Sequence, residues 1–432
     1  MQKRHIAILI SIIAASALAH VLVLARINPA DFYAAPWYAG EGGDAAEYSA
    51  IATHIMRGEG FSLGNASDAI APTAIRPPLY PYFLAGTYGL FGNEHLGAVR
   101  VIQIFFAIGF LALFWLLAWR LTQSAAVSHL AAAALALHPR FILYNLAILT
   151  ESLFFGLLLV TLLAAVQFYK TRRRWYLVGM FGFLALASLT KPTALYVAPL
   201  LAVWIWHVAA NHSAKEAAKN LLLGLGVFML VLSPWLARNY AQFDSIMLTT
   251  KSGGGLAEAW DKTILEPLGI SNRDILTPHQ GLSEQEFSRM GRKIFLSEIW
   301  REPLLMTRIA FQKSLYWFSP HIKSSSATVR ALHAVGTSAI FILGLLGMRL
   351  FWKRRGLTML LPFLLLMTAF SAIHILTVPY HRYRFPVVDT WSILFAAYAA
   401  MELWYRLKSI KFQEANSYVP HTSPSPSSER RG

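Results

Sequence analysis

The sequence of 432 residues contains no cysteine, which excludes a disulfide framework and any chemistry that depends on a thiol. Charged residues are also scarce, at 14% of the chain, while 56% of the residues are hydrophobic. A soluble protein of this length needs more polar surface to cover its body. The composition therefore favours a protein that crosses a membrane several times.

Two common kinds of ligand motif are missing as well. There is no Gly-rich turn of the kind that binds nucleotide phosphates, and the histidines lack the spacing of a zinc site. The net charge of +16 would suggest nucleic acid in a soluble protein, but here the basic residues form short clusters between apolar segments. We therefore expect them to set the orientation in the membrane, and we expect no nucleic-acid partner.

About ten apolar segments approach the roughly twenty residues that a helix needs to cross a bilayer. Because only helices and closed barrels satisfy the backbone in lipid, we interpret them all as helices. They are Ile6–Ala25, Val101–Trp119, Ala125–Leu137, Ser152–Tyr169, Trp175–Thr190, Thr193–Val208, Leu221–Leu236, Ala331–Met348, Leu357–Val378 and Trp391–Met401. The first could also be a signal peptide, since it has a basic start and small residues near its end. Its length favours a retained helix, so we predict an all-α, polytopic helical bundle of about ten transmembrane helices.

Basic clusters between these segments predict the sidedness of the chain. They are Lys3 and Arg4, Arg120, residues 170–174, Lys215 and Lys219, residues 349–355, and Arg406, Lys408 and Lys411. All fall in the cytoplasm if the N-terminus is cytoplasmic, and the C-terminus then lies there too. We expect a multi-pass protein of the cell inner membrane, with a transmembrane domain at 1–411 and a disordered, Ser/Pro-rich cytoplasmic tail at 412–432. The outer loops 27–96 and 237–330 are long enough to hold juxtamembrane helices of their own, for example at 44–56 and 303–320.

Two acidic residues stand out on the outer face. Asp44 opens an amphipathic segment just beyond the first span, and Glu151 begins a span in a strongly apolar stretch. Asp44 could be a solvated loop carboxylate, and Glu151 could cap its helix. A carboxylate at the entrance of a span is nevertheless costly unless it is paired or functional.

Cations at the outer ends of spans run against the positive-inside bias. They are Arg76, Lys191, Arg238, Arg382 and Arg384. Each could be an interfacial anchor, but an anionic group held at this level of the membrane would explain them together. The guanidinium group of Arg suits phosphate in particular.

Five motifs, spread over most of the chain, carry a resemblance to a known family. They are "GGDAAEYSAIATHIMRGEGF", "IRPPLYPYFLAGTYGLFG" followed by "AVRVIQ", "HPRFILYNLAILTESLFFGLLL", "LSPWLARNY" and "HRYRFP". The chain resembles the GT-C superfamily of polyprenyl-phosphate-sugar glycosyltransferases, especially the bacterial branch grouped with protein O-mannosyltransferases and lipid A aminoarabinose transferases. Many of those relatives have adjacent Asp and Glu after the first span, whereas this chain has Asp-Ala-Ala-Glu.

The resemblance implies roles for particular residues. Asp44 takes the position of the catalytic carboxylate, Glu151 that of an assisting acid, and Arg76 that of a residue that contacts the donor phosphate. To the substrate-binding residues we also assign Glu47 and Tyr80 from the same motifs, together with Lys191, Arg238, Arg382 and Arg384. The sequence requires no cofactor, and it neither indicates nor excludes a divalent metal.

The expected activity is inverting transfer of a sugar from a polyprenyl-phosphate donor to an extracytoplasmic acceptor, which could be a lipid, a glycan or a protein. A transporter or flippase for a lipid-linked anion would need the same cations but no base. A non-catalytic envelope protein on this scaffold is a further alternative. Few charges lie within the spans, which disfavours a conduction path.

The cysteine-free background allows a direct test of the predicted sidedness. A single cysteine placed at Arg173 (Arg173→Cys) should react with a membrane-impermeant thiol reagent only after the cells are opened, because the cluster 170–174 is predicted to be cytoplasmic. Labelling in intact cells would show that the cluster 170–174 lies outside and that the predicted orientation is wrong. A permeant reagent, which should label both preparations, controls for accessibility of the thiol.

Overall fold

The structure is a computed structural model that describes residues 3–28, 30–32, 44–64, 70–210, 213–251, 256, 283–320 and 326–417. Within these residues the chain is almost entirely helical. Its only sheet there is the antiparallel pair of β1 (Ser62–Leu63) and β2 (Ala71–Pro72). The predicted fold class, an all-α polytopic membrane protein, is confirmed.

Seven helices of the described ranges are long and apolar enough to cross a membrane. They are α1 (Lys3–Leu24), α4 (Leu96–Thr122), α7 (Glu151–Thr171), η2 with α9 (Pro192–Ala210), α10 (Ala214–Phe243), α15 (Ala327–Arg355) and α16 (Leu357–Leu376). The pair α5 (Ala125–Ala136) and α6 (Pro139–Leu146) is bent by 57° and makes an eighth if it counts as one span. The shorter α8 (Trp175–Ser188) and the less apolar α18 (Thr390–Ser417) cover the other two predicted segments, so ten crossing helices are not confirmed.

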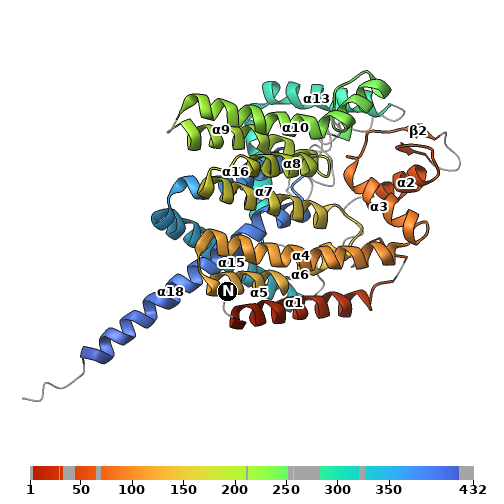
Figure 1. Cartoon of the computed structure of the whole chain (residues 1–432). Helices are drawn as coiled ribbons and strands as arrows, with labels where there is room; N and C mark the ends of the chain where they lie inside the picture. Colours follow the sequence, from red (N-terminus) through yellow and green to blue (C-terminus); the bar gives the residue numbers. More distant parts are fainter. Residues whose placement is uncertain are drawn as a thin grey trace, which may run out of the picture.

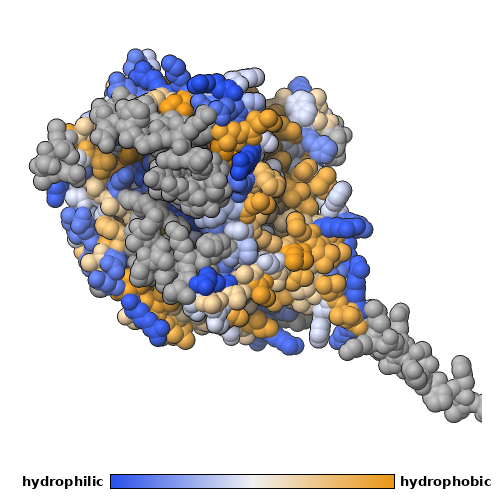
Figure 2. Space-filling model, turned by 180° about the vertical axis from the view of Figure 1, so that it is seen from behind, coloured by the Kyte–Doolittle hydropathy of each residue, from blue (hydrophilic) through white to orange (hydrophobic). Residues whose placement is uncertain are grey.

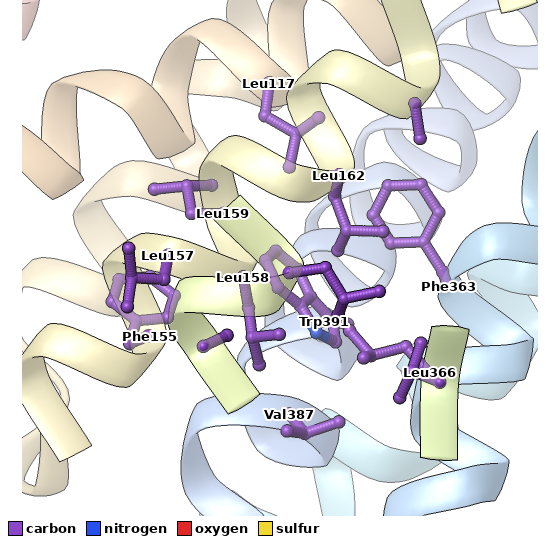
Figure 3. Close-up of a cluster of buried hydrophobic side chains, with 14 of the residues drawn as sticks. Leu117, Phe155, Leu157, Leu158, Leu159, Leu162, Phe363, Leu366, Val387 and Trp391 are labelled. Atoms are coloured by element: carbon purple, nitrogen blue, oxygen red, sulfur yellow. The ribbon is translucent and has the colours of Figure 1, made fainter. Parts of the chain in front are cut away.

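The hydrophobic core centres on α7, which lies in the middle of the bundle (Figure 1). Leu158 of α7 lies beside Trp391 of α18, and Leu162 lies near Phe363 of α16 (Figure 3). The rings of Phe363 and Trp391 meet edge to face, with centroids 5.7 Å apart. Since lipid is as apolar as leucine, close packing of this kind stabilises a membrane bundle more than hydrophobic burial does.

The outer surface of the bundle is itself apolar. Figure 2 shows hydrophobic residues exposed over much of the helical body. Among the large side chains that lie open are Leu222, Leu230, Leu332, Ile342 and Leu345. Such a surface would be a liability in water, and it fits contact with lipid tails.

The two long outer segments contribute helices of their own, as predicted. The described ones are α2 (Asp44–Met56) and α3 (Leu79–Phe91) in the first segment, and α13 (Glu284–Arg301) and α14 (Pro303–Phe318) in the later one. At the other extreme of the chain, α18 continues to Ser417, through the first residues of the segment expected to be disordered. The remainder of that tail, 418–432, lies outside the described residues.

Three of the basic clusters, those at Arg120, 170–174 and 349–355, lie together at one end of the bundle. Lys170 donates a hydrogen bond to the carbonyl of Arg120, and Arg355 donates to the carbonyl of Thr122 at 3.0 Å. Helices α2 and α3 lie away from the free end of α18 (Figure 1). The separation of basic clusters from outer segments agrees with the predicted topology, while the side that faces the cytoplasm stays a prediction.

Close packing of α15 against α18 depends on a glycine. A Cβ added at Gly347 would lie 1.8 Å from the carbonyl oxygen of Phe395, so the two helices could not keep their present separation. We expect Gly347→Ala to lower stability by about 1–3 kcal/mol through overpacking. Gly336, on the same helix, has no heavy atom within 4 Å of its added Cβ.

Gly336→Ala is therefore the matched control, and it should be neutral or stabilising by up to about 1 kcal/mol, since alanine favours helix. Thermal unfolding of the purified proteins in detergent compares the two variants. Equal midpoints for both would show that α15 and α18 do not approach as closely as described.

Candidate active site

The N-terminal turn of α2 presents its acidic residues to one cluster of cations. Asp44 and Glu47 are three residues apart, so both side chains lie on one side of the helix. Arg76 bridges them: its Nη2 lies 2.5 Å from Oδ1 of Asp44, and its Nε lies 2.6 Å from Oε2 of Glu47. Asp44 and Glu47 are therefore held by one guanidinium group.

Arg76 is fixed in this position from both sides. Its guanidinium lies over the ring of Tyr48, 5.2 Å from the centroid, and its side chain is largely buried. The residues that follow it, Pro77 and Pro78, restrict the local backbone before α3 begins. The sequence signal of a cation before a double proline thus corresponds to a rigid, inward-facing arginine.

A second guanidinium reaches Asp44 from the far end of the chain. Arg382 belongs to the single-turn helix α17 (His381–Arg384), and its Nη2 contacts Oδ2 of Asp44. The same nitrogen donates to the hydroxyl of Tyr383 at 2.6 Å. Each oxygen of the Asp44 carboxylate therefore faces a different arginine.

A buried ion pair lies next to this cluster. Nζ of Lys191 is 2.7 Å from Oε1 of Glu151, and the Glu151 side chain is only 2% exposed. Lys191 also lies over the ring of Tyr383, 4.4 Å from its centroid, while the guanidinium of Arg382 lies 4.7 Å from it. Tyr383 thus joins the Asp44 cluster to the Glu151 pair, although it was not among the site residues predicted from the sequence. Its position inside "HRYRFP" is the only signal that could have drawn attention to it.

The electrostatics of Asp44 result from two opposing effects. Burial by itself would raise the pKa of this carboxyl, because it penalises the charged form. The guanidinium groups of Arg382 and Arg76 outweigh burial and hold the pKa well below its usual range. Asp44 is therefore ionised at physiological pH. Three carboxylates and three cations balance across the whole cluster.

Three other predicted site residues, Tyr80, Arg238 and Arg384, lie outside this cluster, the first two beside it. The hydroxyl of Tyr80 donates to Gln103 at 2.9 Å, and its ring packs edge-on against Tyr48. Arg238 donates to the carbonyls of Thr73 and Phe61. These two residues contact the cluster's surroundings rather than its charges.

Arg384 faces away from Asp44, although it is only two residues from Arg382. Its guanidinium donates to the carbonyls of Trp317 and Ser319, and its Nε lies 2.7 Å from Oδ1 of Asp389. Asp389 in turn accepts from Arg140 at 2.9 Å. The structure thus separates the two arginines of the "HRYRFP" motif into different ion-pair groups.

The described residues contain no group of three or more His, Asp or Glu side chains that could hold a metal ion. In the Asp44 cluster, each of the three carboxylates is paired with an arginine or a lysine. The carboxylates of the Asp44 cluster thus contact side-chain cations directly.

Comparisons with known proteins agree with this architecture. Residues 75–237 match the family model for dolichyl-phosphate-mannose-protein mannosyltransferases. The archaeal oligosaccharyltransferase AglB from Archaeoglobus fulgidus, in complex with an inhibitory peptide and a dolichol-phosphate, is similar in fold, with a TM-score of 0.59 and 17% identity over 98% of this chain and 53% of AglB. The Archaeoglobus fulgidus oligosaccharyltransferase in the apo form gives a TM-score of 0.55 at 14% identity, over 98% of this chain and 53% of that one.

A third solved structure, ArnT from Cupriavidus metallidurans bound to undecaprenyl phosphate, has a TM-score of 0.39 and 14% identity over 88% of this chain and 77% of that one. No curated protein matches the sequence. The chain shares the membrane fold of AglB, and the family-model match over 75–237 agrees with the resemblance that its motifs suggested. It spans about half the length of AglB.

The Lys191–Glu151 pair makes a testable contribution to stability. Removing one member of a buried ion pair leaves the other charge unpaired, so Lys191→Met should lower stability by about 3–5 kcal/mol. The exposed pair of Lys219 and Glu216 provides the control, and Lys219→Met should cost less than about 1 kcal/mol. Thermal unfolding in detergent gives the comparison. A midpoint for Lys191→Met equal to that of the control would argue against a charged Glu151.

Proposed function

We propose that this protein transfers a sugar from a polyprenyl-phosphate donor to an acceptor on the outer side of the cell inner membrane, with inversion at the anomeric carbon. The observation that carries the proposal is the Asp44 carboxylate held between Arg76 and Arg382 beside the end of a lipid-exposed bundle. A lipid-borne sugar phosphate requires an acid and strong anion-binding donors together at that level of the membrane. The fold and the family match support the class of reaction.

In this mechanism the two arginines bind the donor phosphate. Their forked donors match phosphate oxygens, and they stabilise the charge that develops on the leaving group. Because both are paired with Asp44 in the structure, the incoming phosphate has to compete with that carboxylate. Donor binding would therefore loosen the hold on Asp44 and free one of its oxygens for the acceptor.

Asp44 then acts on the acceptor hydroxyl. The acceptor oxygen forms a bond to the anomeric carbon from the face opposite the phosphate, and the bond from that carbon to the phosphate oxygen breaks. The electron pair leaves with the polyprenyl phosphate, and the hydroxyl proton passes to Asp44. A low pKa makes Asp44 a weak base, so much of its effect comes from orienting the nucleophile and from the rise in pKa once phosphate draws the arginines away.

The neighbouring pair supports the same chemistry. Glu151 pairs with Lys191, which lies over the ring of Tyr383, and Arg382 of the Asp44 cluster lies over the same ring. We assign Glu151 to orienting the acceptor. AglB was solved with a dolichol-phosphate and a peptide, which supports a lipid-phosphate donor for this fold. Assays with hexosyl and pentosyl donors, and with lipid, glycan and protein acceptors, identify the sugar and the acceptor. A flippase or transporter would use the arginines without needing Asp44 as a base.

The experiment that tests this proposal is single-turnover transfer by Asp44→Asn, with a panel of polyprenyl-phosphate sugars. The amide keeps the size but cannot accept the proton, so the transfer rate of the donor-loaded protein should fall by about 10²-fold or more. Donor affinity should hold or improve, because the phosphate no longer competes with a carboxylate. Some stability should be lost as well, since Arg382 loses a charged partner.

Asp244→Asn is the matched control, because Asp244 is an exposed carboxylate at the end of α10, after the last turn of that helix. It should transfer at the wild-type rate. Wild-type transfer by the folded Asp44→Asn protein would remove Asp44 from the chemistry. Donor binding without transfer by the wild-type protein, across the whole panel, would favour the transporter.

A further inference from the structure

Glu284, the first residue of α13, contacts two segments that lie far from it in the sequence or outside its helix. Ser283 caps this helix in a capping box with Glu286, so the side chain of Glu284 takes no part in the cap. Its Oε1 instead accepts a hydrogen bond from the hydroxyl of Thr73, at 2.5 Å, and its Oε2 accepts from the hydroxyl of Thr250, at 2.9 Å. A third donor, the backbone N–H of Ala74, is 3.3 Å from Oε2. One carboxylate therefore ties three chain segments together.

Every backbone carbonyl of the segment Thr73–Ile75 accepts a hydrogen bond from the later outer region, by which we mean residues 237–330. The carbonyl of Thr73 accepts from Arg238 at 2.7 Å, that of Ala74 from the N–H of Thr250 at 2.9 Å, and that of Ile75 from the hydroxyl of Thr249 at 2.7 Å. Thr73 and Thr250 are buried, so no water competes readily for these bonds. The three carbonyls leave the segment little freedom to shift.

Arg76 is the next residue, and two prolines follow it. After the prolines, the N–H of Leu79 donates to the carbonyl of Leu189 at 3.0 Å, which fixes the far side. Hydrogen bonds therefore fix the backbone on both sides of Arg76, at Thr73–Ile75 and at Leu79. A shift of Thr73–Ile75 would move the guanidinium relative to Asp44 and Glu47 directly, because the prolines cannot absorb it.

We propose that Glu284 is a positioning residue that sets the place of Arg76 for donor phosphate, and so makes donor binding depend on the later outer region. Glu284 acts through the Thr73–Ile75 segment and touches neither the donor nor Asp44. This inference rests on the proposed function, since it takes Arg76 as a phosphate ligand.

Glu284→Gln tests the inference with little change of shape. The substitution removes the negative charge and one of the two acceptor oxygens, so one threonine hydroxyl can no longer donate to residue 284 and the remaining bonds are no longer charge-assisted. The dissociation constant of a polyprenyl monophosphate in detergent should rise about tenfold, the scale of one charge-assisted hydrogen bond. Thr250→Val, which removes one donor while keeping the shape, should weaken binding in the same direction by a smaller factor.

Glu286→Gln is the matched control, because Glu286 lies two residues away on the same helix and its change to Gln preserves the capping box. Its donor affinity should equal that of the wild type. The decisive measurement is a double-mutant cycle with Arg76→Ala. If Glu284 acts through Arg76, Glu284→Gln should change affinity less than about twofold in the Arg76→Ala background.

Two outcomes overturn the inference in distinguishable ways. Equal effects of Glu284→Gln with and without Arg76 would assign Glu284 a general structural role, and wild-type affinity of Glu284→Gln would give it none in donor binding. Both leave the proposed function intact. Wild-type affinity of Arg76→Ala itself would instead refute the phosphate site, and the role of Glu284 with it.

Discussion

The carboxylate of Asp44, held between two guanidinium groups, is the contact on which the rest of the site depends. Its partners stand 32 and 338 residues away along the chain, and its side chain is only 14% exposed. A charge removed from water to this extent is stable only with its partners in place. The start of α2, the segment before α3 and the turn α17 are therefore positioned relative to one another by one acidic side chain.

The motif "HRYRFP" shows how a short segment can serve two purposes. Arg382 and Tyr383 face the Asp44 cluster, whereas Arg384 binds the carbonyls of Trp317 and Ser319 at the end of α14. The single helical turn passes directly into a π-helical stretch, Phe385–Asp389, before α18 begins. Arg384 and Asp389 anchor the turn, and Arg382 is thereby held toward the acid. Such π-helical insertions are often found at functional sites.

The sequence was sufficient for the helical fold class and for the positions of the helices, because the signals involved are local. Apolar length predicts a helix wherever lipid surrounds it, and every predicted segment falls in a helix of the structure. The patterns at 44–56 and 303–320 likewise predict the outer helices α2 and α14. The number of crossings was less certain, since α8 is short and α5 is broken from α6 at Pro139. Length and composition do not decide whether such pieces span a bilayer.

The sequence also singled out Asp44, Arg76, Glu151, Lys191 and Arg382 as unusual, because a charge at a span end is costly wherever it stands. It could not decide which cations face which acids. Arg382 and Arg384 have almost the same local context, yet only the packing of α17 against its neighbours sends one to Asp44 and the other to Asp389. Tyr383 had no signal beyond its place in "HRYRFP", and Glu284 had none, since a glutamate in the first turn of a helix is common. Their importance lies in contacts between segments far apart in the chain, which exist only once the bundle has assembled.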